Sequence, residues 1–69
     1  MKPLLSSMRG SIGIITMNND AHRNVLCEAF FEQLTDLLET FRENRARVVI
    51  LRANPGVHVW SAGHDVNEL

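Results

Sequence analysis

An amphipathic segment lies between two short runs of β-branched residues, and this arrangement limits the fold more than any other feature of the chain. The apolar residues of the segment recur every three or four positions, at Leu26, Phe30, Leu34, Leu37, Leu38 and Phe41. This spacing gives an α-helix one apolar face. We therefore predict a helix over about residues 26–43.

The two flanking runs are predicted to be strands. The first, SIGIITMN, predicts a strand over about residues 11–18, paired with residues around Pro3 to Met8. The second, RVVILRA, is continuously apolar and is followed by the turn sequence NPG. It predicts a strand over about residues 47–53 that is buried on both faces.

A strand, a helix and a strand within this length are typical of a βαβ unit, in which the two strands run parallel. One helix covers only one face of a small sheet, so a strand buried on both faces needs cover from elsewhere. The sequence therefore predicts an incomplete α/β fold.

The last eleven residues, VWSAGHDVNEL, predict a turn over residues 60–65 and the start of another helix over residues 66–69. Asp65 and Glu68 have the spacing of a capping box, in which each side chain would bind a backbone N–H at the start of that helix. An isolated helix needs about 12–15 residues. We therefore expect the chain to be the N-terminal piece of a larger protein.

The turn also has features of a ligand site. The small residues Ser61, Ala62 and Gly63 let a ligand approach the backbone closely. The N–H of His64 follows, just before a helix N-terminus, where negative charge is favoured. Such a donor suits an oxyanion hole if a second donor reaches the same oxygen. A purely structural turn before a helix is the alternative interpretation.

From about Gly10 to Leu69 the sequence resembles the crotonase, or enoyl-CoA hydratase/isomerase, superfamily. The resemblance is carried in order by ITMN, HRNVL, the amphipathic segment and VVILRANPGVHVWSAGHDVNEL. Within the family, WSAGHDVNEL is most similar to the decarboxylases that act on methylmalonyl-CoA. Val25 departs from the alanine that is usual in the family. The fold implied for residues 1–69 is the N-terminal βαβ portion of one crotonase-like (ββα)n spiral domain.

The resemblance also implies roles for residues of this chain. The His64 N–H would be one of two oxyanion donors, and the carbonyl of Ala62, next to Gly63, would accept from the CoA adenine. The CoA path would be lined by His22, Arg23, Val25 and Leu26, with Arg23 near a phosphate. The second donor and the acid/base residues would lie downstream.

The implied chemistry is stabilisation of a CoA thioester enolate, either in decarboxylation to propionyl-CoA or in enoyl-CoA hydration or isomerisation. The thioester is the substrate, and no cofactor or metal is expected. We expect the chain alone to be inactive and the full-length parent to be a homotrimer or hexamer. The alternative from another class is a truncated, non-catalytic remnant that acts as an interaction fragment.

Composition argues against other classes of partner. Seven basic and eight acidic residues give a net charge of −1, so neither nucleic acid nor a membrane surface is an expected partner. No apolar run approaches the roughly 20 residues of a membrane span. The single cysteine, Cys27, fits a cytoplasmic setting and is expected as a weak helix N-cap. The acidic residues of the amphipathic segment are expected on its solvated face.

Overall fold

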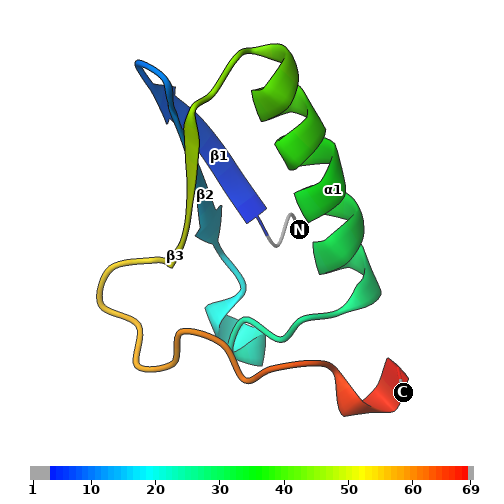
Figure 1. The fold of residues 1–69 in the computed structure, drawn as a ribbon. Coiled ribbons are helices and arrows are strands. Elements are labelled where there is room, and N and C mark those ends of the chain that lie inside the picture. The colour runs from blue at the N-terminus through cyan, green and yellow to red at the C-terminus, as the bar shows by residue number, and fades with distance from the viewer. Residues whose placement is uncertain (1–3, 69) are drawn as a thin grey trace.

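A computed structural model of the chain describes residues 4–68 (Figure 1). Their elements, in chain order, are β1 (Leu4–Arg9), β2 (Ile12–Met17), the 3₁₀ helix η1 (Asp20–His22), α1 (Glu28–Glu43), β3 (Val48–Ala53) and the 3₁₀ helix η2 (Val66–Glu68).

The strands form one sheet in the order β1-β2-β3. β1 pairs antiparallel with β2, and β2 pairs parallel with β3, with Ile15 opposite Ser6 on one side and Leu51 on the other. α1 connects the two parallel strands, so the predicted βαβ unit is confirmed. The antiparallel β1 completes the β-β-α-β order expected for the N-terminal portion of a crotonase fold.

The helix begins at Glu28, two residues after the start predicted from its apolar spacing. Leu26 lies outside it because its backbone pairs with His64 in an isolated parallel bridge. Cys27 does occupy the N-cap position, but its thiol makes no capping hydrogen bond.

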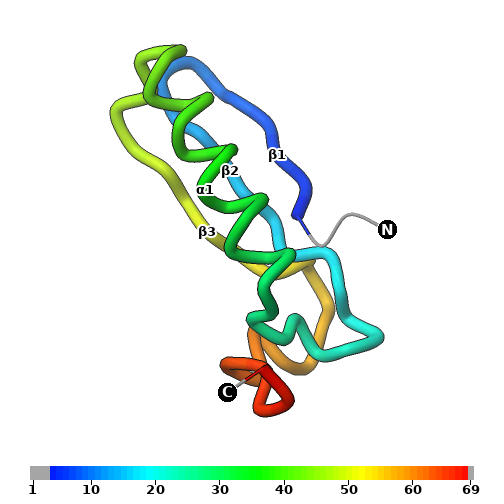
Figure 2. Tube along the Cα trace, turned by 90° about the vertical axis from the view of Figure 1, so that its right-hand side faces the viewer, coloured from blue at the N-terminus to red at the C-terminus, as the bar shows by residue number. Residues whose placement is uncertain are grey.

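The core lies between α1 and one face of the sheet, as Figure 2 shows with the helix in front of the strands. Its buried apolar residues are Leu4, Ile15, Met17, Phe30 and Phe41. Gly13 allows the close approach of Phe41, because a Cβ built at Gly13 would lie 2.9 Å from the ring atoms. The helix is thus held against β2 by a contact that has no room for another carbon.

Within the described residues the third strand, β3, is covered on one face only, so the cover expected for its second face is not supplied by residues 4–68. On the face away from α1, Val48 is 54% exposed and Ile50 is 44% exposed. Ile12, which is opposite Val48 in the register, is 38% exposed on the same face. The single helix covers only the other face, where Leu51 and Ala53 pack against the core. This side of the sheet is therefore an open apolar surface in residues 4–68.

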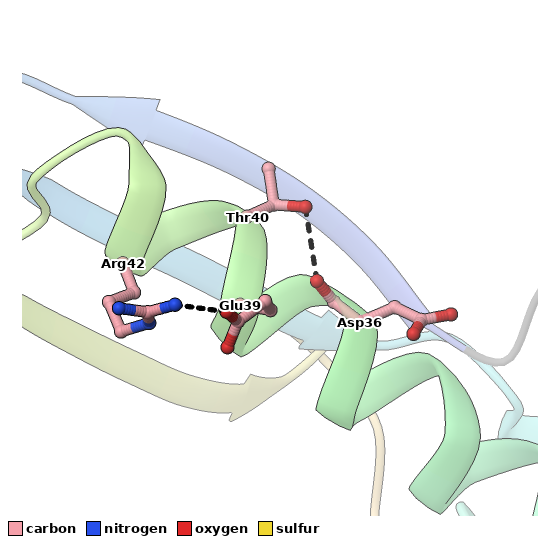
Figure 3. A network of polar contacts seen from close by, with 4 residues as sticks. All are labelled: Asp36, Glu39, Thr40 and Arg42. Carbon is pink, nitrogen blue, oxygen red and sulfur yellow. Dashed lines mark hydrogen bonds and ion pairs between the residues drawn. The ribbon is translucent and has the colours of Figure 1, made fainter.

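The acidic residues of α1 are exposed, as expected. Arg42 pairs with Glu39 one turn away, and the Thr40 hydroxyl donates to the carbonyl of Asp36 at 3.0 Å (Figure 3). The paired Arg42 and Glu39 side chains are 74% and 56% exposed, so the pair adds little to stability. Within residues 4–68, no helix has the length and apolar character to cross a lipid bilayer.

Candidate functional site

Two segments that are distant in sequence are joined by backbone hydrogen bonds at the carboxyl end of the sheet. The N–H of Ala62 donates to the carbonyl of Arg23 at 2.9 Å. The N–H of Leu26 donates to the carbonyl of Gly63 at 2.8 Å, and the N–H of Asp65 donates to the carbonyl of Leu26 at 3.1 Å. The structure thereby brings together five of the seven candidate site residues: Arg23, Leu26, Ala62, Gly63 and His64.

The pairing with Leu26 fixes how the backbone of His64 lies. Leu26 bonds to the residues on either side of His64, as in a parallel ladder, where the skipped residue directs its own N–H and C=O to the opposite side. Among residues 4–68, no acceptor binds the His64 N–H, and no donor binds the Ala62 carbonyl. Both backbone groups that the sequence singled out are thus available to a ligand.

Gly63 sets the direction of the chain just before this donor. Its φ of 89° lies in the region that L-residues with a side chain rarely adopt. A Cβ built there would meet no atom within 4 Å, so the glycine is required by the backbone conformation and not by crowding.

His22 and Val25 are less closely tied to the turn. His22 is exposed at the end of η1, and its carbonyl accepts from the N–H of Val25 at 3.2 Å. In the described part of the chain, no hydrogen bond joins either residue to Ala62, Gly63 or His64. Arg23, whose side chain is exposed, follows η1 in the left-handed conformation with φ of 53°.

Asn24 belongs to none of the patterns that the sequence offers for this site, although it makes four hydrogen bonds here. Its side chain is buried at 3% exposure and its φ is 51°. The side-chain Nδ2 donates to the carbonyl of Trp60 at 3.0 Å, and Oδ1 accepts from the N–H of Asn19 at 2.9 Å. A sequence signal was present, because asparagine tolerates left-handed backbone better than most residues.

The expected capping box is half right. The Asp65 carboxylate accepts from the N–H of Asn67 at 2.9 Å and so begins η2. The Glu68 carboxylate does not reach back to Asp65, whose N–H is already bonded to Leu26. Instead, Glu68 accepts from the N–H of Glu28, the first residue of α1, at 2.7 Å. The carboxylate therefore caps a different helix.

A cavity of about 740 Å³ lies on the α1 side of this turn. It is lined by Glu28, Phe31, Glu32, Thr35, Asp36, His64 and Glu68. The Phe31 and His64 rings lie 6.0 Å apart between centroids. Because four carboxylates face this cavity, it repels phosphate groups, and it contains none of the residues expected to line the CoA path. An anionic ligand is favoured on the Arg23 side of the turn.

Possible metal ligands do not gather here. Within residues 4–68, no three histidine, cysteine, aspartate or glutamate side chains are placed to hold one metal ion.

Comparison with known proteins adds independent information. Residues 7–69 match the enoyl-CoA hydratase/isomerase family. The chain is 36% identical over 58 residues to methylmalonyl-CoA decarboxylase of Escherichia coli, which covers 84% of this chain and 22% of that protein.

Solved structures agree. The structure of methylmalonyl-CoA decarboxylase complexed with 2S-carboxypropyl CoA has a TM-score of 0.90 and 30% identity, over 100% of this chain and 26% of that one. The structure of methylmalonyl-CoA decarboxylase with 2-nitronate-propionyl-CoA has a TM-score of 0.88 and 32% identity, and the match covers 96% of this chain and 25% of that one. The chain thus spans about a quarter of the length of these relatives.

Proposed function

The chain belongs to the enoyl-CoA hydratase/isomerase family, and from this premise we propose that it forms the CoA-binding turn and one oxyanion donor of an acyl-CoA enzyme. The observation that carries the proposal is the backbone of His64. Leu26 bonds to Gly63 and Asp65, the two neighbours of His64, and the His64 N–H is left without an acceptor among the described residues. A fixed donor of this kind stabilises negative charge as it develops on a thioester oxygen.

The reaction we favour is decarboxylation of methylmalonyl-CoA, because the three relatives described above, each at least 30% identical to this chain, are methylmalonyl-CoA decarboxylases. The bond between Cα and the carboxylate breaks and carbon dioxide leaves. The electron pair moves to the thioester oxygen as an enolate, and a proton then adds at Cα to give propionyl-CoA. The His64 N–H donates to the enolate oxygen, and residues outside this chain supply the second donor.

Binding of the CoA portion uses the same turn. The free carbonyl of Ala62 is an acceptor for the adenine amino group, and the exposed Arg23 guanidinium is a partner for a phosphate. Leu26 and Val25 are both half-buried and offer apolar contact to the pantetheine. A cytoplasmic location and a trimeric or hexameric assembly belong to the same proposal.

A second candidate function is that of a non-catalytic chain that acts by docking on another protein. The open sheet face at Val48 and Ile50 favours it, because soluble proteins rarely leave a contiguous apolar surface uncovered without a use for it. This surface does not depend on the His64 turn, so the two candidates can be separated by experiment.

The test is turnover by the protein that carries this chain. Purified protein is mixed with methylmalonyl-CoA, and separately with crotonyl-CoA, and the products are identified by mass spectrometry. Formation of propionyl-CoA supports the favoured reaction. If only crotonyl-CoA is converted, by hydration, the protein is still an acyl-CoA enzyme, but its reaction is hydration and not decarboxylation. Absence of turnover and of CoA binding overturns the enzymatic proposal and leaves the docking function.

A further inference from the structure

Asn24 has more hydrogen bonds than a loop residue needs to satisfy its own backbone. In addition to the two side-chain bonds, its N–H donates to the carbonyl of Asn19 at 2.8 Å, and its carbonyl accepts from the Ser61 hydroxyl at 2.9 Å. All four groups are thus paired in a residue that is 3% exposed. A buried and fully satisfied polar group fixes one arrangement of its neighbours, because any other arrangement leaves a buried group unpaired.

The bonds from Asn24 continue into the turn through Ser61. The Ser61 hydroxyl donates to the Asn24 carbonyl and accepts from the N–H of Gly63 at 3.0 Å. Asn24 therefore binds the turn directly at the Trp60 carbonyl and indirectly, through the Ser61 hydroxyl, at the Gly63 N–H. These bonds hold the Ala62–Gly63 peptide, which immediately precedes the Gly63–His64 peptide whose carbonyl accepts from Leu26.

We propose that Asn24 is a positioning residue that orients the His64 N–H through Trp60, Ser61 and Gly63. The inference rests on the proposed function, in which that N–H binds the thioester oxygen. Asn24 does not itself touch substrate. Its effect is geometric, and a misplacement of about 1 Å by a residue distant from the chemistry can lower a rate by about 10²-fold.

The test is the near-isosteric change Asn24→Asp in the protein that carries this chain. Aspartate keeps an oxygen for the Asn19 N–H but removes the donor to Trp60. The matched control is Asn44→Asp at the other end of α1, where Nδ2 also donates to a carbonyl, that of Thr40 at 2.8 Å. We expect Asn24→Asp to lower kcat by about 10- to 100-fold with KM within about threefold. We expect the control to stay within about threefold in both.

Amide hydrogen exchange over residues 60–65 provides a second measurement that does not need activity. Asn24→Asp should raise exchange there by about tenfold or more, and Asn44→Asp should not. Unchanged exchange overturns the proposal whether or not the wild-type protein is active. If the wild-type protein turns over no thioester, the proposed function fails, and raised exchange still supports positioning of the turn by Asn24.

Two further outcomes are decisive. Raised exchange with unchanged kcat, in an active protein, overturns the claim that the orientation of His64 matters. If Asn24→Asp does not fold, Ser61→Ala replaces it, because this change removes the hydroxyl that links the Asn24 carbonyl to the Gly63 N–H and keeps both bonds of the Asn24 side chain. A fall in kcat with raised exchange in Ser61→Ala supports the proposal, and wild-type values for both overturn it.

Discussion

Glu68 caps α1 from outside the helix: its carboxylate accepts a hydrogen bond of 2.7 Å from the backbone N–H of Glu28. The N-cap residue itself, Cys27, contributes no side-chain bond. A carboxylate at a helix N-terminus satisfies an orphan donor and also interacts favourably with the helix dipole. This contact joins the segment after His64 to the start of α1. Leu26 makes backbone hydrogen bonds to Gly63 and Asp65, on either side of His64.

The first prediction is that Glu68→Ala weakens the start of α1. The loss of the cap should lower the free energy of unfolding by about 0.5–1 kcal/mol. It should also raise hydrogen exchange at the N–H of Glu28 and its neighbours. Glu32→Ala is the control, because Glu32 is an exposed carboxylate on the same helix without a capping bond. Equal effects of the two changes on exchange would refute the capping role.

The second prediction concerns the contact between Gly13 and Phe41. Gly13→Ala places a methyl group 2.9 Å from the ring, so it should destabilise the protein by about 1–3 kcal/mol through overpacking. Phe41→Leu removes the obstructing ring atoms. The double variant should therefore lose less unfolding free energy than the sum of the losses in the two single variants. Denaturant unfolding of all three variants measures these losses. Strict additivity would mean that the two residues do not meet.

The sequence was sufficient for the order of elements because each has a local pattern. The three-and-four spacing from Leu26 to Phe41 predicts a helix, and the β-branched runs predict strands that the structure places side by side. The apolar spacing extends back to Leu26, but the backbone of Leu26 is taken by a tertiary bridge to His64, and α1 begins at Glu28, after the expected N-cap Cys27. Spacing in sequence does not reveal that competition.

The third prediction compares two isoleucines of the sheet. Ile15 is fully buried, so Ile15→Ala should cost about 2–5 kcal/mol. Ile50 is 44% exposed on the open face, so Ile50→Ala should cost about 1 kcal/mol or less. Denaturant unfolding gives both values. A cost at Ile50 equal to that at Ile15 would show that other parts of the protein, or a partner, cover this face.

The fourth prediction tests the side of the turn that binds the CoA phosphates. Arg23→Gln should weaken CoA binding by about fivefold at physiological salt, the effect of an exposed ion pair, and the difference should shrink as salt is raised. Arg45→Gln is a matched control, because Arg45 is exposed and has a similar φ of 61° but follows the far end of α1. Titration calorimetry measures both. Equal losses would remove Arg23 from the CoA site.

The candidate site was only partly predictable for a related physical reason. Ser61, Ala62 and Gly63 signal a close backbone approach by their size alone, and the structure places that turn beside Arg23 and Leu26. The role of Asn24 depends on partners as distant as Trp60, 36 positions away. Glu68 likewise matches a local capping pattern but bonds to Glu28, 40 positions away. Side chains that bind distant backbone cannot be assigned from local spacing.

The last prediction separates the backbone of His64 from its imidazole. If the N–H is the donor to the thioester oxygen, His64→Ala keeps that donor, and kcat should stay within about threefold of wild type. Replacing the peptide N–H of His64 by an ester oxygen through semisynthesis removes the donor and keeps the side chain. That change should lower kcat by about 10²–10³-fold, the typical cost of losing one oxyanion-hole donor. The opposite result, a large loss in His64→Ala and a small one in the ester, would assign the role to the imidazole, which faces the acidic cavity beside Phe31.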